Sequence, residues 1–257
     1  MKTTLKYLLV ALALLAFHSC GKGSITPETE IPKDDKSEPQ PQQITFSKES
    51  GTFAGVTLPY RKALVNSNVT GQNILVLYLH GGSCKGSDNE KQLTEAGVNS
   101  ITNYLKNAGT KAVVIVPQCP STAFWDAASM QPALNSLVTT TAQAHNVNTA
   151  KMYVLGGSMG GTGTWNLISS YPSLFAAAMP CAGNPSKCDV AKVSKTAVYA
   201  VMGTSDNIMS VSTVQEFISQ LNAAGAKVKL DVEAGWTHEQ TCTQSYTSAR
   251  LLWIFSN

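Results

Sequence analysis

Ser158 lies in the segment GGSMG (156–160), which follows the apolar run 152–155 and precedes a stretch with helical patterning. A Gly-x-Ser-x-Gly sequence between a strand and a helix is typical of a sharp turn that lifts a serine hydroxyl clear of a sheet. Such a turn strains the backbone of the serine, and the flanking glycines let the neighbouring chain pass without side-chain clashes. Because the following helix N-terminus stabilises negative charge, the segment predicts a nucleophilic serine.

The general base that this serine needs is predicted to be His238. Four histidines occur in the chain. His18 falls in the N-terminal apolar segment, His80 directly follows a predicted strand upstream of Ser158, and His145 ends a helix-like stretch. His238 follows the last predicted strand, where the histidine lies when a triad runs serine, acid, histidine along the chain.

The acid that orients the imidazole should lie between Ser158 and His238. Asp206 is the best placed, in a turn directly after the strand predicted at 197–202. Asp189, after the preceding strand, is the second candidate. A turn residue that bonds its own backbone is the alternative role for Asp206. Three other acids lie within or beside predicted helices and strands, namely Glu216, Asp231 and Glu233.

An oxyanion hole is expected beside the serine, made by backbone N–H groups. One donor would be Met159, directly after the serine, and the second would come from the loop after His80. Gly82 is the first choice for this second donor, with Gly81 and Ser83 as alternatives, because side chains do not determine backbone donors. His80 itself is expected to brace the loop by hydrogen bonds.

The elements that must position these residues alternate along the chain. Strands are predicted at 57–65, 74–79, 112–116, 152–155, 175–179, 197–202 and 227–232, and helices at about 90–107, 130–145, 159–171, 211–224 and 243–255. Runs that are apolar on both faces are typical of a parallel sheet buried between helices. We therefore predict one domain over 44–257, a mostly parallel, doubly wound α/β sheet, with the site at the carboxyl ends of its strands.

The N-terminus has the pattern of an export signal. Lysines precede the ten-residue apolar run 8–17, which is too short to span a bilayer. We predict a signal peptide at 1–19, lipidation of Cys20 as in bacterial lipoproteins, and a flexible tether over 20–43, rich in proline and charge. Cleavage without lipidation, giving a soluble secreted protein, is the alternative. The lipid would be the only link to a membrane.

Charge and cysteine content exclude several classes of protein. The formal charge is +3, and removal of residues 1–19 leaves 17 basic against 16 acidic residues, so no affinity for nucleic acid is expected. Five cysteines would remain besides Cys20, an odd number, with Cys181 and Cys188 close enough in sequence to pair. No cysteine–histidine spacing matches a zinc site, and the predicted chemistry requires neither a metal nor an organic cofactor.

Four segments carry a resemblance to a known family: LHGGSCKGSDNEKQL (79–93), VPQCP (116–120), YVLGGSMGGTGTWNLISSYPSLFAAAMPCAG (153–183) and GTSDNIM (203–209). They resemble bacterial α/β-hydrolase carboxylesterases related to dienelactone hydrolases, near the polyhydroxybutyrate depolymerase-like and feruloyl esterases. The resemblance implies the same triad of Ser158, Asp206 and His238. It also implies that the strands ending before Cys84 and Cys119 are adjacent, which would allow a disulfide between these cysteines. Trp125 would line the substrate cleft, and the alternative is that its ring only anchors a loop.

The chain departs from the family pattern at two places beside the site. It has SCK (83–85) where a Gly-Glu-Arg type of stretch is usual, and WTH (236–238) where Gly-His is usual. Trp236 thereby becomes a second candidate for the substrate cleft. Both departures concern substrate specificity rather than chemistry.

The predicted function is an exported esterase that works through an acyl-enzyme. Its substrate would be a small ester or a polysaccharide carrying acetyl, feruloyl or other acyl groups. A serine peptidase with the same triad is one alternative, and a catalytically silent surface-binding lipoprotein is another. The sequence does not determine the acyl group, the alcohol or the oligomeric state.

Overall fold

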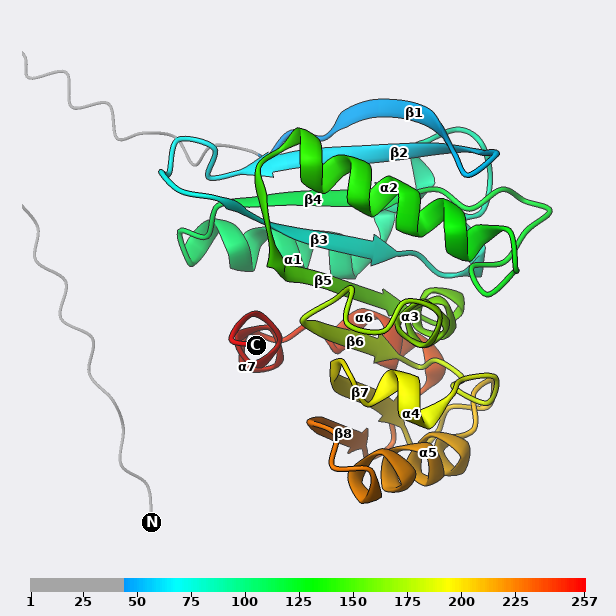
Figure 1. Cartoon of the computed structure of the whole chain (residues 1–257). Coiled ribbons are helices and arrows are strands. Elements are labelled where there is room, and N and C mark those ends of the chain that lie inside the picture. The colour runs from blue at the N-terminus through cyan, green and yellow to red at the C-terminus, as the bar shows by residue number, and fades with distance from the viewer. Residues whose placement is uncertain (1–43) are drawn as a thin grey trace, which may run out of the picture. The chain divides into compact units, whose positions relative to one another are not determined.

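The computed structural model describes residues 44–257, and the predicted signal, lipidation site and tether lie outside them. Within the described part, eight strands form one sheet in the order β1-β2-β4-β3-β5-β6-β7-β8 (Figure 1). The strands are β1 Ser47–Phe53, β2 Val56–Val65, β3 Asn73–Leu79, β4 Ala112–Pro117, β5 Val147–Gly157, β6 Ala177–Cys181, β7 Ala197–Gly203 and β8 Val228–Glu233.

The sheet is parallel from β4 to β8, and only β1 and β2 run antiparallel to their neighbours. All six residues of β4 are buried, as are the last five of β3 and the last six of β5. Central parallel strands covered on both faces bury every side chain, so the continuous apolar runs of the sequence are explained. The predicted mostly parallel α/β sheet is confirmed.

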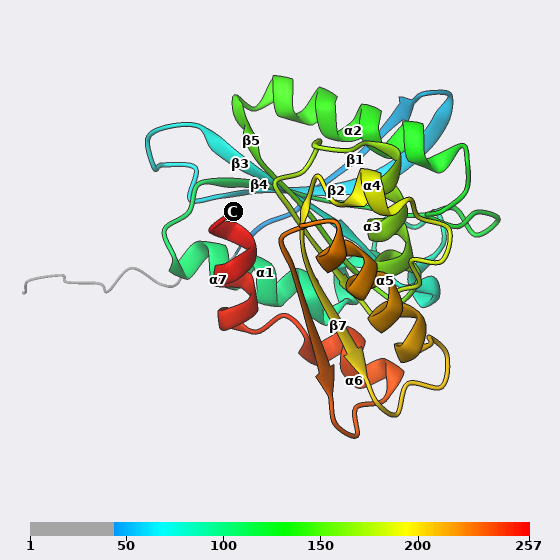
Figure 2. The same ribbon diagram turned by 60° about the horizontal axis from the view of Figure 1, so that its bottom comes forward.

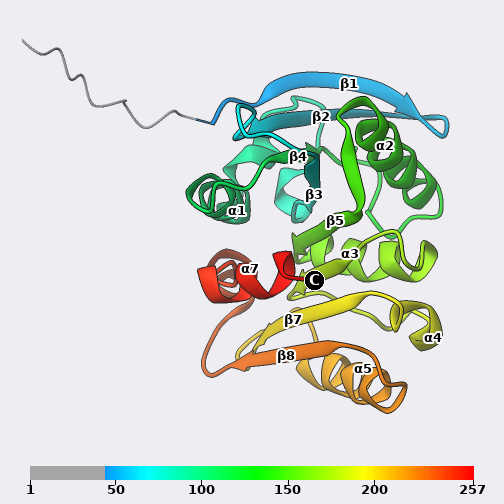
Figure 3. The same ribbon diagram turned by 60° about the vertical axis from the view of Figure 1, so that its left-hand side comes forward.

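Helices cover both faces of the sheet, as Figures 2 and 3 show. Apolar side chains of α2, α3, α4 and α5 pack into one core cluster, and those of α1 and α7 pack into the other. The α-helices are α1 Ala96–Asn107, α2 Met130–Ala144, α3 Met159–Ser170, α4 Val190–Val193, α5 Val211–Ala223, α6 His238–Gln244 and α7 Ser248–Phe255. Two short 3-10 helices are η1 Gly82–Cys84 and η2 Lys91–Thr94. No helix in this part of the chain is long and apolar enough to cross a membrane.

Three element predictions need correction. The strand β1 was not predicted, because its sequence SKESGTF is polar and lies at the sheet edge with most side chains exposed. The helix expected at 90–107 begins only at Ala96, after the separate turn η2. The helix expected at 243–255 is instead parts of two helices: α6 ends at Gln244, with Ser245 as its C-cap, and α7 begins at Ser248, with Thr247 as its N-cap.

Candidate active site

Ser158 occupies the turn between β5 and α3. Its backbone has φ 57° and ψ −119°, a left-handed conformation that is strained for a residue with a side chain. Its N–H donates to the carbonyl of Cys181 at 3.0 Å, which ties the turn to the neighbouring strand. A Cβ on Gly160 would lie 1.8 Å from the carbonyl oxygen of Leu79, so only glycine fits there. Close contact with the backbones of the neighbouring strands thus holds Ser158 in its strained conformation.

Ser158, His238 and Asp206 form one chain of hydrogen bonds. The Oγ atom of Ser158 lies 2.7 Å from Nε2 of His238, and Nδ1 of His238 lies 2.8 Å from Oδ2 of Asp206. The Asp206 side chain is fully buried and the imidazole is 14% exposed. With the Nδ1 proton donated to the carboxylate, Nε2 is free to accept the proton of the serine hydroxyl.

The carboxylate of Asp206 is held from its other side by the backbone. Its Oδ1 atom accepts hydrogen bonds from the N–H groups of Ile208 at 2.9 Å and Met209 at 2.8 Å. Asp206 is therefore both a turn residue and the partner of His238, so the two roles that the sequence left open are compatible. Asp189, the second candidate, instead caps α4 by accepting from Ala191 and Lys192.

His238 is the first residue of α6 rather than a loop residue. Thr237 caps this helix in a reciprocal capping box with Gln240. Two side-chain bonds to backbone N–H groups close the box, so the start of the helix is fixed in position. Because the imidazole stands on the first helical residue, the cap also fixes the direction from which it approaches Ser158.

His80 is buried and braces the loop after β3, as predicted. Its Nε2 atom accepts from the N–H of Cys119 at 2.9 Å, and its Nδ1 donates to the carbonyl of Gly81 at 2.6 Å. Its own carbonyl accepts from the indole of Trp125 at 2.9 Å. Burial lowers the pKa of His80 to about 4, so the ring is neutral at physiological pH and keeps this tautomer.

Met159 and Gly82, the two residues expected to form the oxyanion hole, stand at the starts of separate helices. Met159 begins α3 and Gly82 begins η1, and the first N–H of a helix has no acceptor within it. Both residues and Ser158 line one hollow. Both expected residues are therefore neighbours of the serine.

Glu95 anchors the loop that carries Gly82, and no motif in the sequence points to this role. Its Oε1 atom accepts from the N–H of Gly81 at 3.0 Å and from the thiol of Cys84 at 3.4 Å. Its Oε2 atom accepts from the hydroxyl of buried Tyr78 at 3.2 Å. These bonds join the loop after β3 to the start of α1, so the loop is held by Glu95 as well as by His80.

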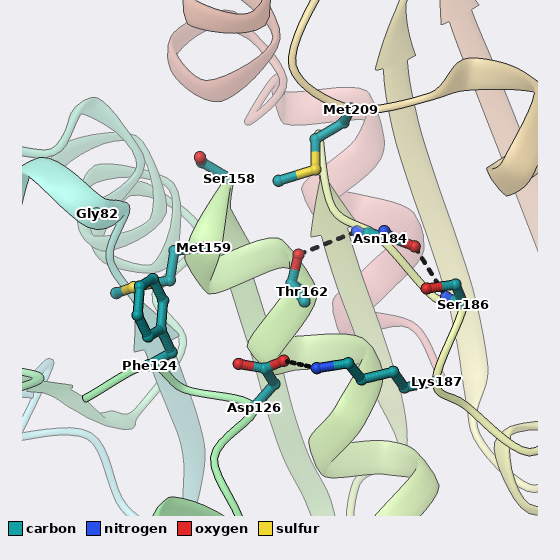
Figure 4. A pocket seen from close by; sticks show the side chains of 10 residues that line it. All are labelled: Gly82, Phe124, Asp126, Ser158, Met159, Thr162, Asn184, Ser186, Lys187 and Met209. Carbon is teal, nitrogen blue, oxygen red and sulfur yellow. Dashed lines mark hydrogen bonds and ion pairs between the residues drawn. The ribbon is translucent and has the colours of Figure 1, made fainter.

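Two hollows open on either side of Ser158. We call the first, of about 400 Å³, the Phe124 hollow, shown in Figure 4, and the second, of about 550 Å³, the His238 hollow. The Phe124 hollow is lined by Gly82, Phe124, Asp126, Ser158, Met159, Thr162, Asn184, Ser186, Lys187 and Met209. The His238 hollow is lined by 81–84, 94–96, Gly157, Ser158, Ile208, His238, Glu239, Cys242 and Thr243. Both share Ser158 and Gly82.

The two tryptophans expected at the cleft lie elsewhere. Trp125 is fully buried against Gly163 and bonded to the carbonyl of His80, so it is the loop anchor that was the alternative role. Trp236 is partly buried against a core cluster, near Arg250, and lines neither hollow. The aromatic residue at the cleft is instead Phe124, which is 55% exposed. Phe124 and Trp125 are adjacent in one loop, and their side chains point in opposite directions.

Neither suggested disulfide is present, because all five cysteines of the described residues are free. Cys181 packs into the core cluster on one face of the sheet and Cys188 contacts the cluster on the other face. Cys119 also lies in a core cluster, whereas Cys84 contacts Glu95 at the start of α1. Cys181 and Cys188, although close in sequence, are thus separated by the sheet.

Cys242 stands beside His238 without competing as a nucleophile. Its sulfur lies 3.9 Å from Nε2, one helical turn along α6. Burial raises the pKa of this thiol, which keeps it protonated. Among the described residues, no group of three histidine, cysteine or acidic side chains is placed to hold a metal ion.

A strained serine on a strand-to-helix turn, hydrogen-bonded to a histidine and a buried aspartate above a mostly parallel sheet, defines the class of α/β-hydrolases. Solved structures agree with this fold. A thermostable esterase superimposes with a TM-score of 0.71 at 24% identity, over 82% of this chain and 62% of that one. The feruloyl esterase module from Clostridium thermocellum, complexed with sinapinate, gives 0.62 at 14% identity, over 82% and 90%.

The chain belongs to the dienelactone hydrolase family, whose model matches residues 102–250. It is also similar to acetylxylan esterase A of Talaromyces purpureogenus, 27% identical over 156 residues, which is 55% of this chain and 41% of that protein. The chain spans less than half the length of that relative.

Proposed function

We propose that this protein is a serine esterase that hydrolyses carboxylic esters through an acyl-enzyme. The observation that carries the proposal is the hydrogen-bonded chain from Ser158 to His238 to Asp206, with distances of 2.7 and 2.8 Å. Family membership and the likeness to esterases support it. The strained turn supports it further, because backbone strain of this kind persists where the surrounding structure enforces a functional geometry.

In the first half of the reaction, the hydroxyl of Ser158 gives its proton to Nε2 of His238 while Oγ attacks the carbonyl carbon of the ester. The N–H groups of Met159 and Gly82 bind the resulting oxyanion. Loss of one such donor reduces the stabilisation of the transition state by about 3 kcal/mol. The imidazolium, stabilised by the Asp206 carboxylate, then protonates the alkoxide as the C–O bond of the ester breaks.

In the second half, a water molecule gives a proton to Nε2 and attacks the acyl carbon. The new tetrahedral intermediate expels Oγ, which takes the proton back from His238. The products are the carboxylic acid, the alcohol and free enzyme. Each proton is transferred by the same imidazole, so the bond between Nδ1 and Asp206 must hold through both halves.

The substrates that we propose are small esters or acylated polysaccharides. The support is the similarity to acetylxylan esterases and to a feruloyl esterase module. The sequence of the first 43 residues supports export and a lipid anchor at Cys20. Replacement of Cys20 by serine should move the protein from the membrane fraction to the soluble fraction, and an unchanged distribution would contradict the anchor.

The catalytic proposal is tested with p-nitrophenyl acetate and a fluorophosphonate probe. Wild type should hydrolyse the ester and be labelled once, and Ser158→Ala should lose both properties. Labelling of Ser158→Ala at the wild-type rate would assign the nucleophile elsewhere. Hydrolysis at the uncatalysed rate by both proteins, without labelling, would contradict the esterase proposal itself.

A further inference from the structure

The two hollows beside Ser158 are chemically unequal. Both contact Ser158 and Gly82, but only one of them contains His238. In the mechanism proposed above, the alkoxide leaves by accepting a proton from Nε2, so the alcohol part of the ester must lie on the imidazole side. The acyl part, which stays bonded to Oγ, must then extend away from the imidazole, into the Phe124 hollow.

We propose that the Phe124 hollow is the acyl-binding subsite and that it takes an extended, largely aromatic acyl group with a hydroxyl at its far end. A hydroxycinnamoyl group has this chemistry, and an acetyl group does not. The inference rests on the proposed esterase function and narrows it to an acyl class. Three features of the hollow support it: its apolar walls near the serine, a neutral polar pair opposite the serine, and its size.

The wall near the serine is apolar and polarisable. Phe124, Met159 and Met209 line it, and thioethers and aromatic rings favour contact with an aromatic ring. Phe124 is held in place although it is 55% exposed, since the Lys85 ammonium lies 4.0 Å from its ring centroid and donates to the carbonyl of Ala123 at 3.2 Å. Lys85 belongs to the SCK stretch that departs from the family pattern.

The opposite end of the hollow is polar but electrically neutral. Figure 4 shows Ser158 at one end and the ion pair of Asp126 and Lys187 at the other, with the two side chains 2.8 Å apart. The pair leaves ammonium protons and carboxylate lone pairs for a ligand. Because Asp126 balances the charge of Lys187, the pair favours a neutral group that both donates and accepts, such as a phenolic hydroxyl, over a carboxylate.

The size of the hollow also favours a long acyl group. A volume of about 400 Å³ corresponds to roughly 13 water molecules at about 30 Å³ each. An acetyl group would fill a small part of this space. A ring joined to the carbonyl by a short linker would fill a much larger part of the space.

The test compares three esters on purified wild type and variants: p-nitrophenyl acetate, methyl cinnamate and methyl 4-hydroxycinnamate. Phe124→Ala should lower kcat/KM about tenfold for both aromatic esters, because a ring contact is lost. Lys187→Met and Asp126→Ala should lower it about tenfold for the hydroxylated ester alone, because one hydrogen bond is lost. In each variant the acetate should lose less activity than the ester whose contact is removed, because an acetyl group fills only a small part of the hollow.

Lys195→Met is the matched control, an exposed lysine that lines neither hollow. It should leave all three esters unchanged. Equal losses for the three esters in Phe124→Ala, or equal losses for the two cinnamates in Lys187→Met, would overturn the assignment while leaving the esterase function intact. Absence of turnover of any ester by wild type, without probe labelling, would instead overturn the proposed function and the subsite together.

Discussion

Replacement of Asp206 by asparagine tests the proposed mechanism most directly. The change keeps the shape of the side chain and exchanges one oxygen for an NH2 group. The N–H groups of Ile208 and Met209 both point at Oδ1, at 2.9 and 2.8 Å, so the oxygen of the amide must stay at that position. The NH2 group is then forced to face Nδ1 of His238.

The size of the expected loss of kcat follows from the imidazole tautomer that the asparagine imposes on His238. An NH2 group can only donate, so Nδ1 must accept, and the imidazole proton moves to Nε2. A protonated Nε2 cannot take the proton of Ser158, and the imidazolium loses its neighbouring negative charge. A replacement of this type lowers kcat by about 10⁴-fold in a serine protease, which is about 5 kcal/mol of transition-state stabilisation. We expect a loss of the same order here.

The assay is hydrolysis of p-nitrophenyl acetate by Asp206→Asn, together with fluorophosphonate labelling and thermal unfolding. Labelling should slow in parallel with turnover, while the unfolding temperature should change little, because the hydrogen bonds of Oδ1 remain. Asp189→Asn is the control, and it should keep wild-type turnover since Asp189 caps α4. Turnover of Asp206→Asn within tenfold of wild type would refute the reasoning and require another acid.

Three further outcomes are expected. The free energy of unfolding should be about 1 kcal/mol larger for Ser158→Gly than for Ser158→Ala, since glycine removes the strain at φ 57°. Equal unfolding temperatures of the two variants would contradict the strain. His80 has a pKa of about 4, below its ordinary 6.5, so the unfolded chain binds the proton first. Stability should therefore fall by up to about 3 kcal/mol between pH 6.5 and 4, and urea unfolding of His80→Gln should show a shallower fall. Glu95→Ala should lower kcat about tenfold at constant KM, with recovery in Glu95→Gln, whose amide oxygen can still accept from Gly81; a change in KM alone would indicate a different role.

The parts of the molecule that the sequence predicts are those determined by local patterns. A central parallel strand needs apolar side chains on both faces, so β3, β4 and β5 were recognisable from their runs. The turn at Ser158 needs glycine where Leu79 passes at contact distance, so its sequence shows its shape. The chain order of Ser158, Asp206 and His238 follows from where successive strands of such a sheet end.

The parts that the sequence does not predict depend on the direction in which a side chain points in three dimensions. Phe124 and Trp125 are adjacent, and only the packing of Trp125 on α3 decides which of them meets solvent. Glu95 falls inside the helix predicted at 90–107, but it stands before α1 and bonds to a loop fourteen positions earlier. Cys181 and Cys188 are close in sequence but lie on opposite faces of the sheet.

Within the site, the residues assigned to chemistry and the residues assigned to substrate recognition differ in how firmly the fold holds them. The groups assigned to chemistry are buried or fixed by backbone bonds, as Asp206 is by the turn it closes and Gly82 is by the loop that Glu95 anchors. The groups assigned to recognition, such as Phe124 and Lys187, are exposed side chains on loops after β4 and β6. Their replacement removes little burial, so loops of this kind can change substrate without disturbing the fold. Substitutions in the Phe124 hollow should therefore alter the order in which esters are preferred, whereas substitutions around Asp206 should slow all esters alike.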